Sequence, residues 1–184
     1  PHERYGLDLP KRVLSMRKQQ NIILAAIISL TLLADPALAQ SLVGKVVSVA
    51  DGDTITILDG DRTQHKIRLS GIDAPERSQA FGRLSREHLA SLVAGEKVAV
   101  ETDKTDRFGR SVGKVLLHGR DINLTMVAAG LAWHYKKYEM EQPAVERLSY
   151  ANAEDQAREN RAGLWRDPEP TAPWDWRTAK RSRQ

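Results

Sequence analysis

The chain has 184 residues, with 28 Lys plus Arg against 24 Asp plus Glu and no Cys, and 41% of its residues are hydrophobic. This length and composition are typical of one globular domain with short appendages, and they exclude a disordered or collagen-like chain. The lack of cysteine excludes disulfides, thiolate zinc sites and thiol nucleophiles, while the formal net charge of +4 favours an anionic partner only weakly.

An apolar run near the amino end predicts an export signal. Basic residues precede the run at 22–33, and an Ala-Leu-Ala motif ends at Ala39, after which we expect cleavage. The run is shorter than the roughly 20 apolar residues of a membrane span, and an uncleaved anchor is the alternative. Met16 is the expected start of the signal, and the residues ahead of it have no expected role. We therefore predict a secreted or periplasmic monomer, without stable membrane association once residues 1–39 are removed.

The mature chain opens with short strands separated by Asp-Gly turns. The expected strands cover residues 43–49, 54–58, 66–69, 98–101 and 112–117. Apolar residues at helical spacing, with cap residues at the ends, predict helices over residues 78–93, 122–129 and 143–160. Five strands and about three helices indicate an α+β class, a small barrel with packed helices, within a domain covering residues 40–166. We expect residues 167–184 to be an irregular Pro/Trp-rich stretch with a basic tail.

Three local clusters carry candidate chemistry. The first is Asp51-Gly52-Asp53-Thr54, the second runs from Arg68 to Glu76, and the third covers Asp106 to Arg110. Taken singly, each cluster has a simpler structural explanation. The first and third read as turns with solvated charges, and the acids of the second as caps or dipole partners of a helix.

Together the clusters supply the groups that phosphodiester hydrolysis requires. Asp53 and Asp73 are hard oxygen donors suited to Ca²⁺, with carbonyls, waters and a substrate phosphate completing the shell of the ion. Arg68 and Arg110 are expected to form a planar, two-armed clamp on the phosphodiester. Glu76 is expected to hold or deprotonate the attacking water.

These motifs also carry a family resemblance. Asp-Gly-Asp-Thr, Arg-Leu-x-Gly-Ile-Asp-Ala-Pro-Glu and Asp-Arg-Phe-Gly-Arg, in this order, resemble the motifs of the staphylococcal (micrococcal) nuclease family, the thermonucleases, over residues 43–165. The resemblance implies an OB-fold five-stranded barrel with helices and Ca²⁺ as cofactor. It also implies an endonuclease that hydrolyses DNA and RNA to 3′-phosphate products.

The resemblance assigns site residues by position. The calcium ligands match Asp53, Asp73 and, through its backbone carbonyl, Ala74; the catalytic trio matches Arg68, Glu76 and Arg110. Ala74 stands where the type enzyme has threonine, a change that keeps the carbonyl. The segment between Glu76 and Arg110 is shorter than in the type enzyme, so the loop beside the base differs.

The residues expected to touch the nucleotide depart furthest from the family pattern. Arg107 replaces a lysine near the nucleotide phosphate, and Phe108 replaces a tyrosine. Of the two tyrosines that flank the nucleotide in the type enzyme, one matches Tyr138 and the other is displaced to Tyr135. Lys136 lies between them. We expect Arg107, Tyr135, Lys136 and Tyr138 to contact the nucleic acid.

Two other functions compete with the nuclease hypothesis. A non-catalytic nucleic-acid-binding module is the main alternative, because this fold also serves as a binding platform. Such a module would be expected to lose an acid or an arginine from the set, and none is missing here. A surface-associated structural protein is suggested by export and the Trp/Pro-rich tail, but this hypothesis explains none of the three clusters.

Overall fold

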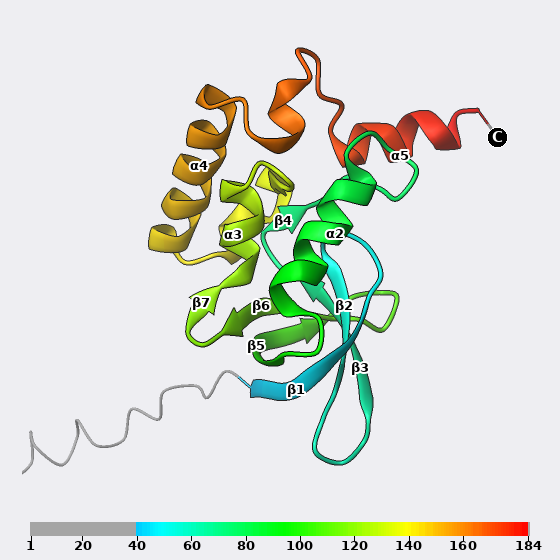
Figure 1. Ribbon diagram of the computed structural model, residues 1–184, viewed down its shortest axis with the longest axis vertical. Coiled ribbons are helices and arrows are strands. Elements are labelled where there is room, and N and C mark those ends of the chain that lie inside the picture. The colour runs from blue at the N-terminus through cyan, green and yellow to red at the C-terminus, as the bar shows by residue number, and fades with distance from the viewer. Residues whose placement is uncertain (1–39, 184) are drawn as a thin grey trace, which may run out of the picture. The chain divides into compact units, whose positions relative to one another are not determined.

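Five strands form a closed barrel in the computed structural model, which describes residues 40–183 (Figure 1). The strands are β1 (Gln40–Val49), β2 (Thr54–Leu58), β3 (Gln64–Leu69), β5 (Lys97–Thr105) and β6 (Ser111–Leu117). Antiparallel pairing joins β3, β2, β1, β5 and β6 in that order, and a parallel pairing of β3 with β6 closes the ring. The two-residue β7 (Arg120–Asp121) pairs antiparallel with the end of β6. The barrel confirms the expected α+β fold; the predicted export signal lies outside the described residues.

Successive side chains along the strands point alternately into the barrel and out of it. Ile67 and Leu69 on β3 are buried in the barrel, whereas Arg68 between them points outward. On β2, Ile55 pairs with Ile67, and Ile55 and Ile57 are both fully buried. The period of two therefore keeps an arginine on the outer face of a strand whose inner face anchors the core, as the sequence pattern predicts.

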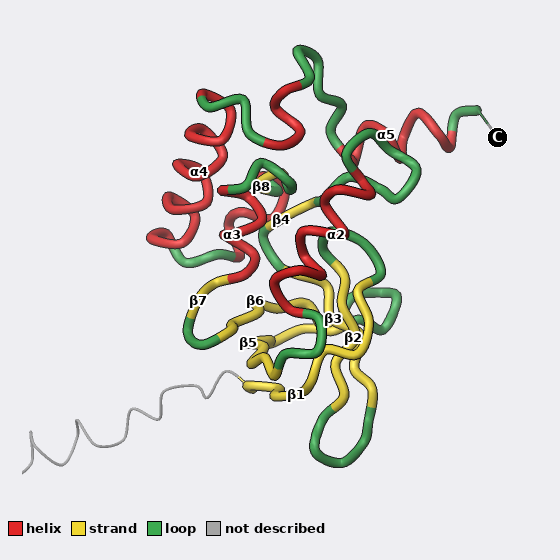
Figure 2. The backbone as a smooth tube through the Cα atoms, viewed as in Figure 1, coloured by secondary structure: helices red, strands yellow, loops and turns green. Residues whose placement is uncertain are grey.

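The helices and a second, smaller sheet gather at one side of the barrel strands (Figure 2). The helices are α2 (Gly82–Val93), α3 (Ile122–Ala128), α4 (Ala144–Glu159) and α5 (Pro173–Arg181), with 3-10 turns η2 (Lys136–Glu141) and η3 (Gly163–Arg166). The small sheet pairs β4 (Ile72–Asp73) antiparallel with β8 (Trp133–His134). Asp121 caps α3 by accepting a hydrogen bond from the Leu124 N–H at 2.9 Å, as predicted.

Every predicted helix and strand is observed, and the structure adds the short strands β4, β7 and β8, the turns η2 and η3, and the helix α5. The expected strand 54–58 is observed with the same bounds, and the other four extend by one to four residues at one end or both. The predicted helix 78–93 begins four residues later, at Gly82, and the helix α5 lies within a segment expected to be a tail. Both differences arise next to the candidate site.

The late start of α2 is caused by two tight turns that follow Pro75. The Gln79 N–H donates to the Glu76 carbonyl at 2.8 Å, and the Gly82 N–H donates to the Gln79 carbonyl at 3.0 Å. A Cβ at Gly82 would lie 1.9 Å from the Glu76 carbonyl oxygen, so only glycine fits there. These turns hold the backbone of Glu76 against the start of the helix.

Within residues 40–183, no helix combines the length and the apolar composition that a membrane crossing requires.

Candidate active site

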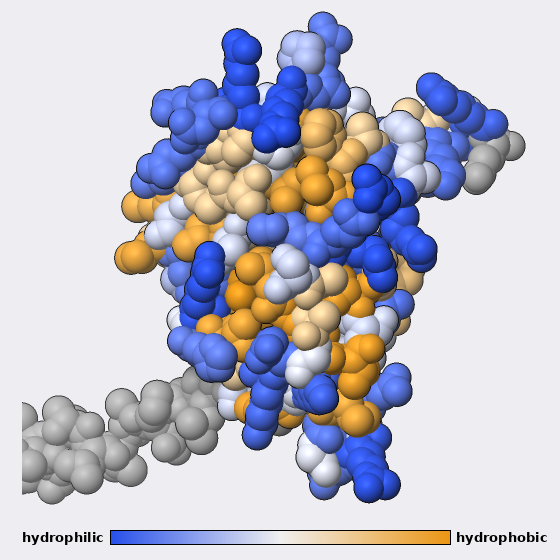
Figure 3. Space-filling model, viewed as in Figure 1, coloured by the Kyte–Doolittle hydropathy of each residue, from blue (hydrophilic) through white to orange (hydrophobic). Residues whose placement is uncertain are grey.

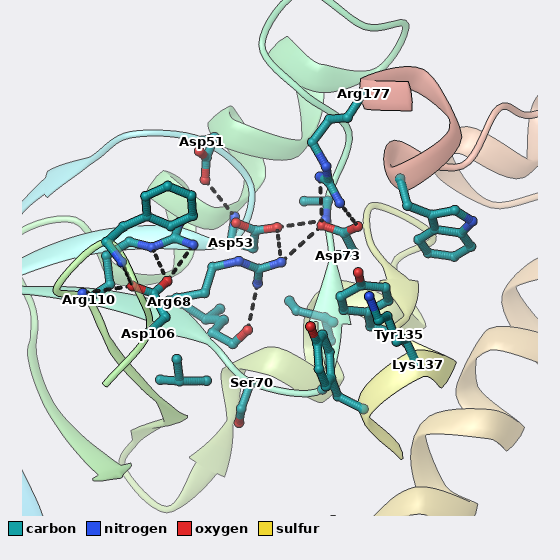
Figure 4. Close-up of a pocket in the computed structure, with 18 of the residues that line it drawn as sticks. Asp51, Asp53, Arg68, Ser70, Asp73, Asp106, Arg110, Tyr135, Lys137 and Arg177 are labelled. Carbon is teal, nitrogen blue, oxygen red and sulfur yellow. Dashed lines mark hydrogen bonds and ion pairs between the residues drawn. The ribbon is translucent and has the colours of Figure 1, made fainter. Parts of the chain in front are cut away.

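A groove of about 1300 Å³ runs along one end of the barrel, and the three sequence clusters all contribute to its wall (Figure 4). This volume exceeds the roughly 300–1,000 Å³ of a typical small-molecule pocket. A groove of this size is suited to a long polymer. The predicted site residues that line it are Asp53, Arg68, Asp73, Ala74, Glu76, Arg107, Arg110, Tyr135, Lys136 and Tyr138.

The floor of the groove, defined here as Asp53, Arg68 and Asp73, is a buried group of charges. One nitrogen of Arg68, Nη2, lies 3.1 Å from Asp53 Oδ2 and 3.0 Å from Asp73 Oδ1. The side chains of Asp53 and Asp73 are only 8% and 1% exposed, so neither carboxylate is solvated by bulk water. The two acids therefore depend on cationic partners for their charge.

The Asp-Gly-Asp-Thr turn holds Asp53 in the floor. The Asp53 N–H donates to Asp51 Oδ1 at 3.1 Å, and the Ala74 N–H donates to Asp53 Oδ2 at 2.7 Å. A Cβ at Gly52 would overlap Ser85 Oγ at 1.8 Å and Ala74 Cβ at 2.8 Å, so the glycine allows the turn to press against α2. Burial, with the nearby charge of Asp53, raises the pKa of Asp51 to about 6.

Asp73 and Glu76 follow β3 in the chain, directly after the strand that carries Arg68. Asp73 lies on β4, where it pairs with Trp133 of β8. Burial raises the pKa of Asp73, and the negative charge of Asp53 adds to the rise. A hydrogen bond from Arg177 and the charges of Arg68 and Arg177 oppose it. The Glu76 side chain is 38% exposed at the edge of the floor, and its Oε1 accepts a hydrogen bond from Arg177 Nη1 at 2.8 Å.

Arg110 reaches the groove from a turn that supplies its own carboxylate. Asp106 Oδ1 accepts the N–H groups of Phe108 and Arg110 at 2.8 and 3.0 Å, and Asp106 Oδ2 accepts Arg110 Nε at 2.7 Å. Arg110 Nη1 also lies 3.4 Å from Thr54 Oγ1, which donates to Asp53 Oδ1 at 3.1 Å. Thr54 therefore links Arg110 to the floor of the groove.

Aromatic and basic side chains form the opposite wall. The rings of Tyr135 and Tyr138 meet edge to face with centroids 5.1 Å apart, and the ammonium of Lys137 lies 5.5 Å from the Tyr138 ring. On the facing side, Arg107 lies over the ring of Phe108 at 4.8 Å, within the turn from Asp106 to Arg110. The ammonium of Lys136 is instead engaged by His134 Nδ1 at 2.7 Å and by buried Glu154 at 3.4 Å, so of the predicted nucleotide contacts it is the one tied to the protein interior.

The structure adds residues to the site that the sequence reasoning missed. Thr54 belongs to the Asp-Gly-Asp-Thr motif, but its bridging role depends on Arg110 arriving from 56 positions further along the chain. Trp174 and Arg177 come from α5, beyond the three clusters. The signals for that helix are Pro173 in its first turn and the basic pair Lys180-Arg181 in its last turn. These signals predict a helix, but they do not predict where it docks.

Asp53 and Asp73 have the chemistry of ligands for a hard divalent cation. Both present carboxylate oxygens to the same cationic nitrogen of Arg68, so the protein already brings a positive charge to this point. Across the described residues, no group of three or more His, Cys, Asp or Glu side chains converges as a metal-binding set. A cation here would therefore need backbone carbonyls, waters or substrate oxygens besides the two carboxylates.

The sequence profile of a family described as staphylococcal nuclease homologue matches residues 66–167. The chain belongs to the staphylococcal nuclease family. An uncharacterized endonuclease of Escherichia coli O157:H7 is 42% identical over 146 residues, covering 79% of this chain and 91% of that protein. Protein ParB of Escherichia coli is 39% identical over 170 residues, covering 87% and 92%. A micrococcal nuclease of Shigella flexneri is 39% identical over 148 residues, covering 76% and 82%.

Membership of this family makes the chain a nuclease, a hydrolase whose substrates are nucleic acids. Nucleases of the staphylococcal family generally depend on a metal ion. The matched residues 66–167 include Arg68, Asp73, Glu76 and Arg110. The helix α5 lies beyond them, at Pro173–Arg181.

Proposed function

We propose that this nuclease is an exported, Ca²⁺-dependent enzyme that hydrolyses the phosphodiester bonds of both DNA and RNA to 3′-phosphate products. One observation carries the proposal: segments separated by up to 57 positions, from Asp53 to Arg110, line one groove, with two buried acids sharing one arginine nitrogen. Charges that had only structural roles would not need to be gathered at the floor of a large groove.

The proposed cation site consists of Asp53, Asp73 and the backbone carbonyl of Ala74. A bound Ca²⁺ would supply positive charge to a substrate phosphate oxygen. The burial of both carboxylates supports this assignment, because buried acids need cations near them. The hydrogen bond from the Ala74 N–H to Asp53 Oδ2 at 2.7 Å supports it further, since it ties the proposed ligands into one rigid group.

Arg68 and Arg110 would bind the substrate phosphodiester from two sides. A guanidinium carries paired N–H donors that match the oxygens of a phosphate, and such bonds strengthen as charge builds on the oxygens in the transition state. Arg68 would exchange part of its present contacts, to Leu69, Asp53 and Asp73, for the phosphate. Asp106 Oδ2 lies 2.7 Å from both Nε and Nη2 of Arg110, so the remaining nitrogen, Nη1, faces the floor near Thr54. The donor fork is thereby oriented before substrate arrives.

Glu76 would accept a proton from the attacking water. The water oxygen forms the new bond to phosphorus, and the bond from phosphorus to the 5′ oxygen breaks, which leaves the phosphate on the 3′ side. The 5′ oxygen leaves with a proton from solvent. Glu76 stands at the edge of the floor with 38% of its side chain exposed, so water can reach it. Arg107, Tyr135 and Tyr138 would contact the nucleotides on either side, and Lys136 would do so by exchanging His134 and Glu154 for a phosphate.

A substitution of Glu76 tests the proposal directly. Glu76→Gln keeps the shape of the side chain but cannot accept the proton, so we expect kcat on plasmid DNA and on RNA to fall by roughly 10²–10⁴-fold. Glu87→Gln, which changes an exposed acid on α2, is the matched control and should keep full activity. An unchanged rate in Glu76→Gln would remove Glu76 from the mechanism.

Removal of the metal tests the cofactor. The purified protein should degrade DNA with Ca²⁺ present and stop when a chelator is added. Degradation in both conditions would reject the calcium assignment. Degradation in neither, with DNA still bound, would favour a non-catalytic binding module instead. Analysis of the product ends by mass spectrometry would show whether the phosphate stays on the 3′ side.

A further inference from the structure

The carboxyl-terminal helix α5 is docked on the same loop that carries Glu76. Gln79 joins the two segments: its Oε1 accepts the Glu76 N–H at 3.1 Å, and its Nε2 donates to the Thr171 carbonyl at 2.6 Å. Ala172 and Pro173 are buried where the helix begins. The helix therefore starts from an anchored point rather than from a free tail, although its outer surface is largely hydrophilic (Figure 3).

An aromatic contact holds the helix over the groove. The indole of Trp174 lies nearly parallel to the ring of Tyr135, with centroids 5.4 Å apart and 12° between the planes. The same indole meets Trp133 edge to face at 5.5 Å. Trp133 pairs with Asp73 across the small sheet. The position of α5 is thus coupled to the strand that carries a floor acid.

One turn further along α5, Arg177 inserts into the floor. Its Nη2 lies 2.7 Å from Asp73 Oδ2, and its Nη1 lies 2.8 Å from Glu76 Oε1 (Figure 4 shows Arg177 pointing at Asp73). One guanidinium therefore joins Asp73, the proposed cation ligand, to Glu76, the proposed general base. Burial acts against the charge of Arg177, but the hydrogen bonds to Asp73 and Glu76 outweigh it and raise its pKa, so Arg177 stays cationic.

We propose that Arg177 is a further active-site residue of this nuclease, with two coupled effects. It is a positioning residue that fixes the Glu76 carboxylate relative to Asp73, and its charge opposes the binding of a divalent cation at Asp73. The roles of Asp73 and Glu76 in this inference rest on the proposed function. The contacts that place Arg177 between them do not.

The physical reason for the opposition is charge. A guanidinium and a Ca²⁺ ion at the same carboxylate repel each other, and in a partly buried site this repulsion is screened far less than in water. The reason for the positioning is geometry, because a planar fork with two parallel donors fixes the relative orientation of two acceptors, which a single ammonium cannot do. The first effect weakens metal binding and the second favours turnover.

These opposite signs make the proposal testable with Arg177→Met, which keeps the length of the side chain but removes its charge and donors. We expect calorimetric titration with CaCl₂, without nucleic acid, to give a Kd roughly tenfold lower than in the unsubstituted protein. At saturating Ca²⁺ we expect kcat on DNA to fall by roughly tenfold, because Glu76 loses its partner. A merely structural residue would weaken both.

Two further variants complete the test. Arg177→Lys keeps the charge but not the fork, so its Ca²⁺ affinity should return to that of the unsubstituted protein while kcat is restored only in part. Lys180→Met removes an exposed charge from the same helix and should change neither quantity. Thermal unfolding of each variant would confirm that it is folded.

Three outcomes would overturn the proposal. Unchanged Kd and kcat in Arg177→Met would show that the contact has no role, and weakening of both would show a structural role. A raised KM with an unchanged Kd for Ca²⁺ would make Arg177 a substrate ligand. Failure of the proposed function is distinguishable, because every variant would then lack Ca²⁺ binding or Glu76→Gln would keep full activity.

Discussion

The floor of the groove and the turn at Asp106–Arg110 solve the same problem in different ways. Each must keep an arginine in place beside carboxylates. In the floor, two acids from separate segments share Arg68, and the side chains are 13% exposed or less. In the turn, Arg110 and its one carboxylate partner, Asp106, are four residues apart and about one-fifth exposed. The floor depends on distant segments folding together, whereas the turn is locally complete.

The pKa of the aspartate shifts in opposite directions in the two regions. Burial acts to raise the pKa of both Asp73 and Asp106. In Asp73 burial prevails over the neighbouring arginines, and the pKa is raised. In Asp106 the hydrogen bonds from Arg110 and from the Phe108 backbone prevail, and the pKa is lowered. The same interactions therefore give opposite results, and the depth of the site decides which one wins.

The largest expected difference is in stability. Arg68→Met leaves buried Asp53 without its cation and Asp73 with Arg177 alone, and breaking a buried pair in this way typically costs about 3–5 kcal/mol. Arg110→Met leaves only the more exposed Asp106, for which we expect about 1 kcal/mol or less. Urea unfolding at pH 7 measures both values. Equal losses in the two variants would show that the floor and the turn do not differ in this respect.

Activity should depend on the turn despite its small contribution to stability. Removing a donor that stabilises transition-state charge typically costs about 10²–10³ in rate. We expect Arg110→Ala to lower kcat/KM by this amount, and Arg110→Lys to recover only a part of it, because lysine lacks the planar fork. Arg83→Ala, at an exposed position of α2, is the control. Full recovery with lysine would mean that charge alone suffices.

A smaller effect on stability should distinguish the two Asp-Gly turns, which look the same in the sequence. At Gly52 an added Cβ would overlap Ser85 Oγ and Ala74 Cβ, whereas at Gly60 it would meet no atom within 4 Å. We expect Gly52→Ala to cost about 1–3 kcal/mol through overpacking and to lower activity by moving Asp53. Gly60→Ala should change neither. Comparable losses in both variants would contradict the close approach at Gly52.

The same contrast explains what could be predicted from the sequence. The period-two pattern at Ile67 and Leu69 placed Arg68 on the outer face, and the Asp-Gly turns marked the ends of the strands. These signals are local, since they depend on backbone geometry and on neighbours in the chain. The turn from Asp106 to Arg110 is predictable for this reason, because its partners lie within five residues.

The contributions of long-range contacts could not be predicted. Arg177 meets Asp73 across 104 positions, and no local pattern encodes that pairing. The late start of α2 was not predicted for a similar reason. Two tight turns bring the Glu76 carbonyl close to Gly82, and they take the place of the first turn of the expected helix. The proline-rich stretch before α5 favoured an irregular tail, whereas burial of Ala172 and Pro173 anchors the helix.

The smallest expected effect is on the pH dependence of stability, and it concerns His134, next to the tyrosines of the groove. His134 is 1% exposed. Lys136 Nζ, which can only donate, lies 2.7 Å from its Nδ1, so Nδ1 accepts and Nε2–H donates to Gln142 Oε1 at 2.9 Å. Burial first, and the charge of Lys136 next, lower the pKa of His134, although the Gln142 hydrogen bond and the charges of Glu154 and Glu139 oppose this.

Because the folded state holds fewer protons on His134 than the unfolded state does, its contribution to stability is complete above pH 6.5 and is lost as the pH falls below that value. We expect His134→Gln to flatten the fall in unfolding free energy between pH 6.5 and 5, measured by urea unfolding at several pH values. His118→Gln, which removes an exposed histidine, is the matched control. A slope that is the same with and without His134 would show that the buried ring does not resist protonation, and that the acid sensitivity of the fold arises elsewhere.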